Sequence, residues 1–134
     1  MKVLVDTCVW SKVLRRKEPD KDLAGLIEDL IRDGRVVLIG PIRQELLSGV
    51  PHPAQFELLR KALEPFEEIP LRTEHFVRAA EFSNQCRRKG IQGSTIDFLI
   101  CAVAAMEELQ ILTTDGDFLR YAKHLPIRLC GVTA

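Results

Sequence analysis

The chain has 134 residues and a mass of 15.2 kDa, which is room for one domain, and 46% of its residues are hydrophobic, enough for a self-sufficient core. A single domain over residues 1–134 is therefore expected. Nineteen basic and nineteen acidic residues sum to a net charge of zero, which excludes a strongly basic body that holds nucleic acid by phosphate neutralisation alone.

The first half of the chain alternates between the apolar spacing of buried strands and that of amphipathic helices. Short β-branched runs predict the strands, and apolar positions three and four residues apart predict the helices. The expected elements are a strand at 2–5, a helix through 9–14, a helix from Asp20 to just before Gly34, a strand at 35–39, a helix opened by Gly40-Pro41 and a helix at 53–63. Asp20 is a candidate N-cap, because its carboxylate can accept from the free N–H groups of the first turn.

The second half of the chain continues the same alternation. The expected elements are an extended piece at 68–70, a helix at 73–88, a helix from Ser94, a strand at 111–113, a short helix at 118–122 and a strand at 127–130. The helix from Ser94 is apolar on nearly all sides, which predicts a central helix packed between other layers. The whole pattern predicts an α/β fold with a mostly parallel central sheet flanked by helices.

Two further features exclude other classes of protein. No apolar run approaches the roughly 20 residues of a membrane-spanning helix, so no membrane association is expected. The four cysteines are dispersed without a Cys-x-x-Cys pair, which indicates reduced thiols in a cytoplasmic protein. The three histidines are equally scattered, so neither a zinc site nor a Cys–His nucleophile is expected.

Acidic residues are expected to gather at one edge of the sheet. Asp6 follows the first strand, Glu45 lies early in the helix after the second strand, and Asp115 follows the strand after the central helix. Asp97 lies at the start of the central helix, whose N-terminus faces the same edge if that helix leads back along the sheet. Asp117 is a further candidate. Parallel sheets place ligand sites at the C-terminal edge of their strands, so we expect these side chains to meet there.

Each acid also has a simpler explanation when it is taken alone. Asp6 can end a strand, and the acid of the helix after the second strand can complement a helix N-terminus. Asp97 follows Ser94 at the capping-box spacing, and Asp115 forms a common turn pair with Gly116. Taken together these explanations weaken, because converging carboxylates raise one another's pKa unless a cation neutralises them. Carboxylate oxygens without His or Cys suit Mg²⁺ or Mn²⁺.

Four ordered segments carry these acids: VDT at Asp6, PIRQELLSG around Glu45, STIDFLICAVA around Asp97, and LTTDGDF around Asp115 and Asp117. Over nearly the whole chain this order resembles the PIN domain, and the compact length resembles the VapC-type toxins of prokaryotic type II toxin–antitoxin pairs. The resemblance implies a PIN-like fold with a central parallel sheet of about five strands. The first four acids match the family's four acidic positions, and Asp117 matches a fifth, more variable one.

The activity that the resemblance implies is that of a metal-dependent endoribonuclease. A metal-activated water would attack an RNA phosphodiester in line and leave a 5′-phosphate and a 3′-hydroxyl. Asp6, Asp97 and Asp115 match direct ligands of Mg²⁺, with Mn²⁺ as an alternative, and Asp117 matches a position that acts through water. Glu45 either binds the metal or orients the water.

The resemblance also implies supporting residues and partners. Thr7 and Thr114 match the small hydroxyl residues that support the first and last acids. A VapB-like antitoxin is expected to block the acidic groove with its C-terminal segment, where an arginine would meet the carboxylates. A homodimer is also implied. The apolar stripe at 53–63 is a candidate for the dimer contact, although core packing is favoured because most such stripes pack internally.

Contacts to RNA must come from local basic residues, since the net charge is zero. The candidates are Arg15, Arg16, Lys17, Arg43, Arg87, Arg88 and Lys89. Both triplets end predicted helices, where cations also complement the helix dipole, so the two interpretations are equally open. Arg43 lies two residues before Glu45 and therefore off its helical face.

Other functions compete with this one. A haloacid-dehalogenase-type phosphatase needs a second acid where this chain has Cys8, and a receiver-like domain needs an acidic pair where Asp6 stands alone. Two alternatives within the family stay open: a PIN-like module that binds RNA or protein without turnover, and a PIN nuclease of RNA maturation.

Overall fold

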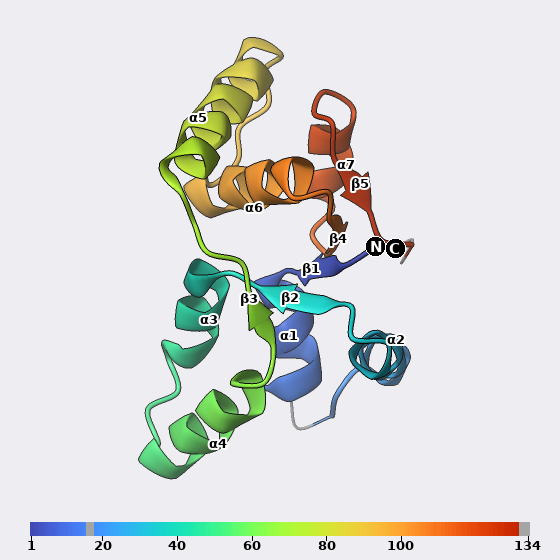
Figure 1. Ribbon diagram of the computed structural model, residues 1–134, viewed down its shortest axis with the longest axis vertical. Helices are drawn as coiled ribbons and strands as arrows, with labels where there is room; N and C mark the ends of the chain where they lie inside the picture. The colour runs from blue at the N-terminus through green and yellow to red at the C-terminus, as the bar shows by residue number, and fades with distance from the viewer. Residues whose placement is uncertain (16–17, 132–134) are drawn as a thin grey trace.

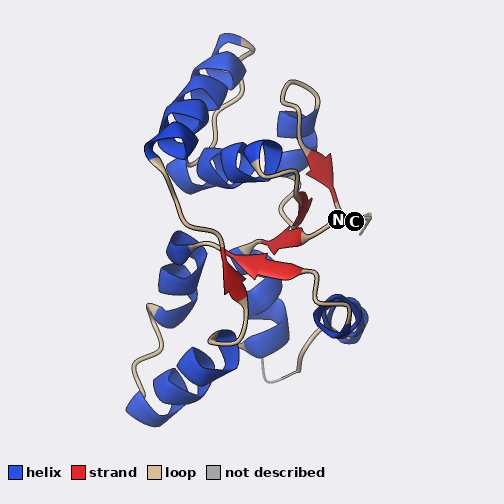
Figure 2. Ribbon diagram, viewed as in Figure 1, coloured by secondary structure: helices blue, strands red, loops and turns tan. Residues whose placement is uncertain are grey.

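The computed structural model describes residues 1–15 and 18–131. Five strands form one parallel sheet in the order β3-β2-β1-β4-β5. The strands are β1 (Val3–Val5), β2 (Val36–Leu38), β3 (Glu67–Glu68), β4 (Gln110–Leu112) and β5 (Arg128–Leu129). Leu4 of β1 lies opposite Val37 on one side and Ile111 on the other. The predicted α/β architecture with about five parallel strands is confirmed (Figure 2).

Seven helices in the described part of the chain surround this sheet. They are α1 (Thr7–Leu14), α2 (Lys21–Arg32), α3 (Gly40–Leu47), α4 (Pro53–Leu63), α5 (Thr73–Arg88), α6 (Thr95–Met106) and α7 (Asp117–Ala122). Helices α5 and α6 lie together on one side of the strands, whereas α1 and α4 lie on the other (Figure 1). Within residues 1–15 and 18–131, no helix is both long and apolar enough to cross a bilayer.

Short polar side chains fix the starts of three helices. The Asp6 carboxylate accepts from the Thr7 N–H at the start of α1, and Asp20 accepts from the Leu23 N–H at 3.1 Å at the start of α2. The Ser94 hydroxyl accepts from the N–H of the residue three positions later at 3.1 Å and begins α6. These groups satisfy N–H donors that have no partner within the helix. The predicted caps at Asp20 and Ser94 are thereby confirmed.

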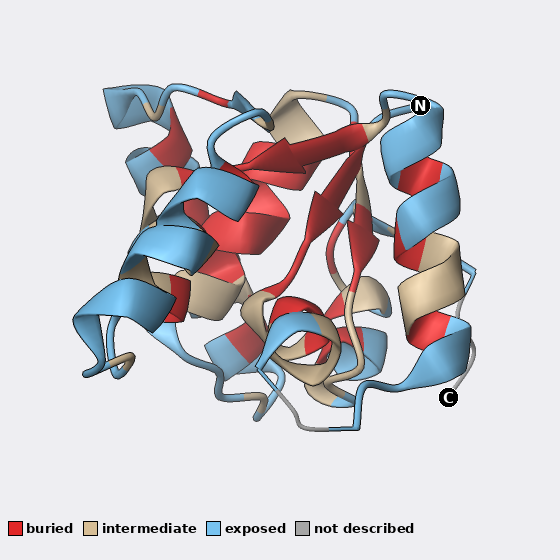
Figure 3. Cartoon of the chain, turned by 90° about the horizontal axis from the view of Figure 1, so that it is seen from below, coloured by how far each residue is buried: buried red, intermediate tan, exposed pale blue. Residues whose placement is uncertain are grey.

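Helix α6 occupies the centre of the molecule. All residues from Phe98 to Ala104 are buried, because α5 covers one side of this helix and β4 lies against another. The strands β1 and β2 are buried as well, and buried residues are concentrated in the strands and in the helix faces that meet them (Figure 3). The prediction of a central helix packed between layers is confirmed.

The apolar stripe of α4 packs in part against this core. Leu63 is fully buried and Leu59 is half-buried against the core cluster. Leu58, which lies on a different side of the helix, is 71% exposed.

The strand order reverses between β1 and β4. From the central strand β1 the chain first builds β2 and β3 on one side, and then returns to add β4 and β5 on the other. The Asp6 N–H donates to the Leu112 carbonyl at 2.9 Å and joins the C-terminal ends of the two strands at this reversal. Such a reversal leaves a crevice at the C-terminal edge of a parallel sheet, where ligands bind.

Candidate active site

Asp6 lies at the end of β1 with only 8% of its surface exposed. Its Oδ1 accepts from the Thr7 N–H at 2.8 Å, and its Oδ2 accepts from the Thr113 hydroxyl at 2.8 Å and the Cys8 thiol at 3.4 Å. Burial raises the pKa of Asp6 above its ordinary value, although these hydrogen bonds lower it, and the charge of Asp97 adds a smaller rise. A negative charge at this position therefore benefits from a nearby cation.

Asp97 reaches the same edge from the first turn of α6. Its Oδ2 accepts from the Tyr121 hydroxyl of α7 at 2.8 Å. Burial is the main cause that raises the pKa of Asp97, and the neighbouring charges of Asp115 and Asp117 raise it further, while hydrogen bonds from Tyr121 and Ser94 oppose them. The prediction that α6 leads back along the sheet, with its N-terminus at the acidic edge, agrees with this contact.

Asp97, Asp115 and Asp117 form the most compact acidic group of the site. One carboxylate oxygen from each lies within 4.8 Å of the others. Asp115 accepts from the Asp117 N–H at 2.9 Å, which holds the turn after β4 in place. Asp117 also pairs with Arg120 at 2.7 Å on the exposed side of α7. Asp6 stands beside this group rather than within it, because its oxygens are directed at Thr113 and the start of α1.

Glu45 approaches the site from the second turn of α3. Its carboxylate is exposed, and Oε2 accepts from the Thr7 hydroxyl at 3.2 Å. The backbone N–H of the same threonine donates to Asp6. Thr7 therefore connects Asp6 and Glu45 and holds both at the C-terminal edge of the sheet.

The two threonines after β4 have different contacts. Thr113 donates to Asp6 and accepts from the Asp115 N–H at 3.0 Å, so it joins two of the acids directly. Thr114, the residue predicted for support, instead accepts from Lys12 at 2.9 Å and donates to Cys8 at 3.3 Å. Adjacent residues of an extended segment point in opposite directions, so only one of the two threonines can face the acids.

Sequence reasoning did not identify Thr113, Tyr121 or Lys12 as site residues. Thr113 lies inside the LTTDGDF segment, and strand alternation relative to Asp115 offered the only signal for it. Tyr121 and Lys12 reach the site from α7 and α1, and no spacing pattern in the sequence marks them.

The basic residues predicted to bind RNA are distributed differently from the acids. Arg43 points away from the acids, because its guanidinium donates to Glu68 Oε1 at 2.8 Å and to the Leu63 carbonyl at 3.2 Å and so ties α3 to β3. Arg15 is exposed at the end of α1 and donates to the Gly49 carbonyl at 3.5 Å. The other predicted residues are Arg87, Arg88 and Lys89, which are exposed at the end of α5, and Arg16 and Lys17, which lie outside the described residues.

The donor chemistry of the acidic group fits a hard divalent cation. Its oxygens come from carboxylates alone, the ligand type that Mg²⁺ and Mn²⁺ prefer. Only Asp117 of the three has an ion-pair partner, so the negative charge of the group is largely uncompensated within residues 1–15 and 18–131. Asp97, Asp115 and Asp117 can hold such an ion, with Asp6 beside them.

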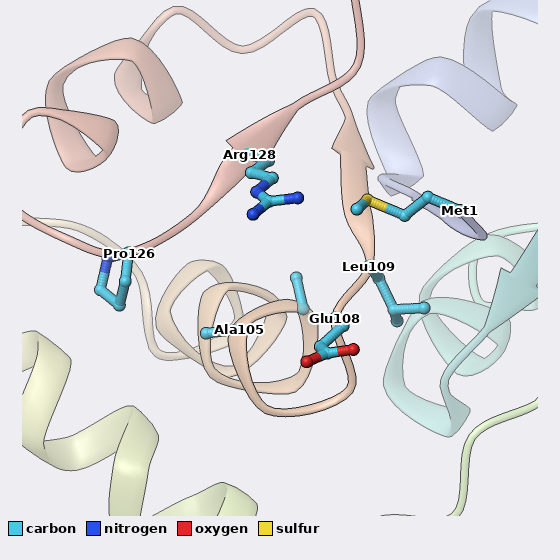
Figure 4. A pocket seen from close by; sticks show the side chains of 7 residues that line it. Met1, Ala105, Glu108, Leu109, Pro126 and Arg128 are labelled. Atoms are coloured by element: carbon cyan, nitrogen blue, oxygen red, sulfur yellow. The ribbon is translucent and has the colours of Figure 1, made fainter.

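A hollow at the opposite end of the strands has a different character. It has a volume of about 330 Å³ and is lined by residues that precede β1, β4 and β5, among them Met1, Leu109 and Pro126. Arg128 and Glu108 face it from opposite sides (Figure 4). Its lining contains a single carboxylate, so this hollow lacks the converging acids of the C-terminal edge.

The fold and the site together define an α/β protein whose parallel sheet carries a candidate divalent-cation site where the strand order reverses. The model of the PIN domain matches residues 3–124, and the chain belongs to the PIN domain family. This confirms the resemblance that the four acidic segments suggested. No curated protein sequence matches the chain significantly.

Solved structures share this fold along nearly the entire chain. FitAcB from Neisseria gonorrhoeae is 22% identical with a TM-score of 0.78, and the match covers 95% of each chain. VapBC2 from Rickettsia felis, bound to a DNA fragment of its promoter, is 19% identical with a TM-score of 0.75 and coverage of 97% and 98%. VapBC-5 from Mycobacterium tuberculosis, a member of the VapBC family of toxin–antitoxin systems, is 19% identical with a TM-score of 0.70 and coverage of 98% and 100%.

Proposed function

We propose that this PIN domain protein is an endoribonuclease that depends on Mg²⁺ or Mn²⁺ and acts as the toxin of a toxin–antitoxin pair. One observation carries the proposal: the carboxylates of Asp97, Asp115 and Asp117 converge within 4.8 Å beside the buried Asp6. Converging carboxylates of this kind are costly without a cation, and hard cations recruit phosphate oxygens as further ligands.

The side chains have distinct roles in this proposal. Asp97, Asp115 and Asp117 hold the cation, and Asp6 either joins them or fixes their surroundings through Thr113. Glu45 is exposed and held only by Thr7, so it is placed to orient the attacking water or accept its proton.

When bound, a divalent cation supplies positive charge that stabilises the phosphodiester as negative charge develops in the transition state. The hydrogen bonds from Tyr121 to Asp97 and from Thr113 to Asp6 fix the carboxylates before substrate arrives. Preorganisation of this kind reduces the reorganisation needed during the reaction. The products are a 5′-phosphate and a 3′-hydroxyl.

The toxin assignment and the partners rest on the comparisons. Toxin–antitoxin complexes from several organisms share the fold, which supports an antitoxin partner for this chain. A homodimer is part of the same proposal, and Phe76 and Val77 on α5, which are 52% and 55% exposed, supply apolar surface for a second copy. We also propose a cytoplasmic location, in agreement with four free thiols.

The direct test is cleavage of labelled RNA by the purified protein with Mg²⁺, with Mn²⁺ and with chelator. Asp97→Asn is expected to abolish cleavage while circular dichroism shows an intact fold. Asp22→Asn is the matched control, because Asp22 is likewise an acid in the first turn of a helix but lies on α2. Full activity of Asp97→Asn would refute the proposed site.

The same samples separate the alternatives. Metal-dependent RNA binding without product would support a binding module, whereas cleavage without growth arrest on expression would support a nuclease of RNA maturation. Growth arrest that a co-expressed neighbouring small protein relieves would support the toxin.

A further inference from the structure

Lys12 extends from α1 to the loop after β4 and places an ammonium group at the edge of the acidic site. Its Nζ donates to the Thr114 hydroxyl at 2.9 Å, and the side chain is half-buried. Thr114 directly precedes Asp115, one of the three converging acids. A lysine on the helix after the first strand is thus brought beside acids that lie about a hundred positions away in the chain.

The charge of Lys12 has no carboxylate partner among residues 1–15 and 18–131. Lys2 and Arg120, by contrast, each pair with a carboxylate, Lys2 with Glu67 and Arg120 with Asp117. An ammonium has three donors, and the single hydrogen bond from Lys12 goes to a neutral hydroxyl. A partly buried charge without a counter-charge is unfavourable, so a ligand that brings negative charge would be stabilised here.

A chain of hydrogen bonds holds this ammonium in place. The Thr114 hydroxyl donates to the Cys8 thiol at 3.3 Å, and that thiol donates to Asp6 Oδ2 at 3.4 Å. Cys8 and Lys12 are four residues apart on α1, so both side chains lie on the helix face that meets the loop. Lys12 is therefore held relative to Asp6 and need not lose its full rotamer entropy when a ligand binds.

We propose that Lys12 binds a backbone phosphate of the RNA, adjacent to the phosphate that is hydrolysed. The inference rests on the proposed function, which supplies the RNA. A divalent cation held by Asp97, Asp115 and Asp117 would repel the ammonium and would itself recruit the phosphate that is hydrolysed, so the neighbouring phosphate is the anion left for Lys12. Lysine binds phosphate as a point charge, so this contact adds affinity without selecting a base.

The test compares Lys12→Met, which keeps the length of the apolar stem and removes the charge, with Lys12→Arg, which keeps the charge. Lys61→Met is the matched control, because Lys61 is an exposed lysine on α4, a helix that contributes none of the acids of the site. Binding of a single-stranded RNA of fixed sequence is measured with Ca²⁺ in place of Mg²⁺ over a series of KCl concentrations. Steady-state cleavage is measured with Mg²⁺.

Lys12→Met is expected to reduce the slope of log affinity against log salt concentration by about 0.7, the value for one lost phosphate contact on a single strand. KM is expected to rise about tenfold, while kcat changes less than about twofold. Lys12→Arg is expected to restore most of the affinity and the slope. Thr114→Val removes the anchor of the ammonium and is expected to raise KM in a manner that is not additive with Lys12→Met.

The inference is overturned if Lys12→Met lowers Tm and kcat with an unchanged salt slope, because a lysine that only pins α1 to the loop would behave in this way. It is also overturned if Lys61→Met changes the slope as much as Lys12→Met does. Failure of the proposed function has a separate signature, since it would appear as an absence of metal-dependent cleavage in the wild-type protein. Cleavage that Asp97→Asn abolishes, together with an unaltered slope in Lys12→Met, refutes the contact alone.

Discussion

Substitution of Gly93 by alanine tests the packing that supports Asp97. Gly93 lies in the loop before α6, against the hydroxyl end of Tyr121. A Cβ at this position would overlap the Tyr121 hydroxyl oxygen and would lie 2.8 Å from Cζ of the same ring and 3.0 Å from Cε2 of Phe98. Ordinary contacts of this kind are 3.4–4 Å. The added methyl therefore has to displace the tyrosine ring.

The ring has little freedom to move. Tyr121 is fully buried, and its centroid lies 5.0 Å from that of Phe98 and 5.2 Å from that of Phe118. Overpacking of a core costs about 1–3 kcal/mol, which for a domain of this size lowers Tm by about 3–10 °C. The displacement also breaks the 2.8 Å hydrogen bond between Tyr121 and Asp97, so we expect a loss of RNA cleavage beyond the loss of stability.

Thermal unfolding by circular dichroism and RNA cleavage below the unfolding range measure the two effects separately. Gly25→Ala is the control: this glycine lies inside α2 with nothing within 4 Å of an added Cβ, so the substitution is expected to stabilise by about 0.5–1 kcal/mol. Tyr121→Phe in the Gly93→Ala background removes the overlapping oxygen and is expected to recover part of the lost stability. Wild-type Tm and full cleavage in Gly93→Ala would refute the reasoning, because the expected losses of stability and of cleavage both follow from the packing of Tyr121 against Gly93.

Three further outcomes follow from the site and the helix caps. Burial raises the pKa of Asp6 and Asp97 in the folded state above the unfolded value of 3.8. The folded state therefore binds more protons than the unfolded state, and the contribution of these two acids to stability falls as pH rises through the raised pKa values. Asp97→Asn is therefore expected to raise Tm at pH 7 without divalent metal, by an amount that shrinks as pH falls toward 3.8. A difference in calorimetric Tm between Asp97→Asn and the wild type that does not change with pH would contradict this. Mg²⁺ at ten times its Kd is expected to stabilise the wild type by about 1.4 kcal/mol and Asp97→Asn far less, whereas equal shifts in both proteins would place the ion elsewhere. Asp20→Ala removes the acceptor for the Leu23 N–H and is expected to cost about 1 kcal/mol in urea unfolding, and no change would show that this cap is dispensable.

Local chemistry explains why the helices and strands could be predicted. The start of α2 follows from Asp20 and the start of α6 from Ser94, since a cap acts on N–H groups within three residues of itself. Hydrophobic spacing likewise reports the burial of one short segment at a time. The order of the strands is a different matter, because β1 pairs with β4 across more than a hundred residues and no local pattern specifies this pairing.

The convergence of the acids could also be predicted, because parallel strands end at one edge and Asp6 and Asp115 each follow such a strand. The grouping within the site could not. Asp97 joins Asp115 and Asp117, while Asp6 is directed at Thr113, and these choices depend on side-chain directions across separate elements. Spacing along the chain has no information about such directions.

The sequence by itself determined the family, the α/β architecture and the acidic edge, since these depend on periodicity and on ordered motifs. Only the tertiary structure decided that Thr113 supports Asp6, that Tyr121 holds Asp97, and that Lys12 lies beside the acids. The net charge of zero illustrates the difference. The net charge is a sum over the chain and says nothing about where the charges lie. The fold places carboxylates together at one edge, where their mutual repulsion favours a bound cation.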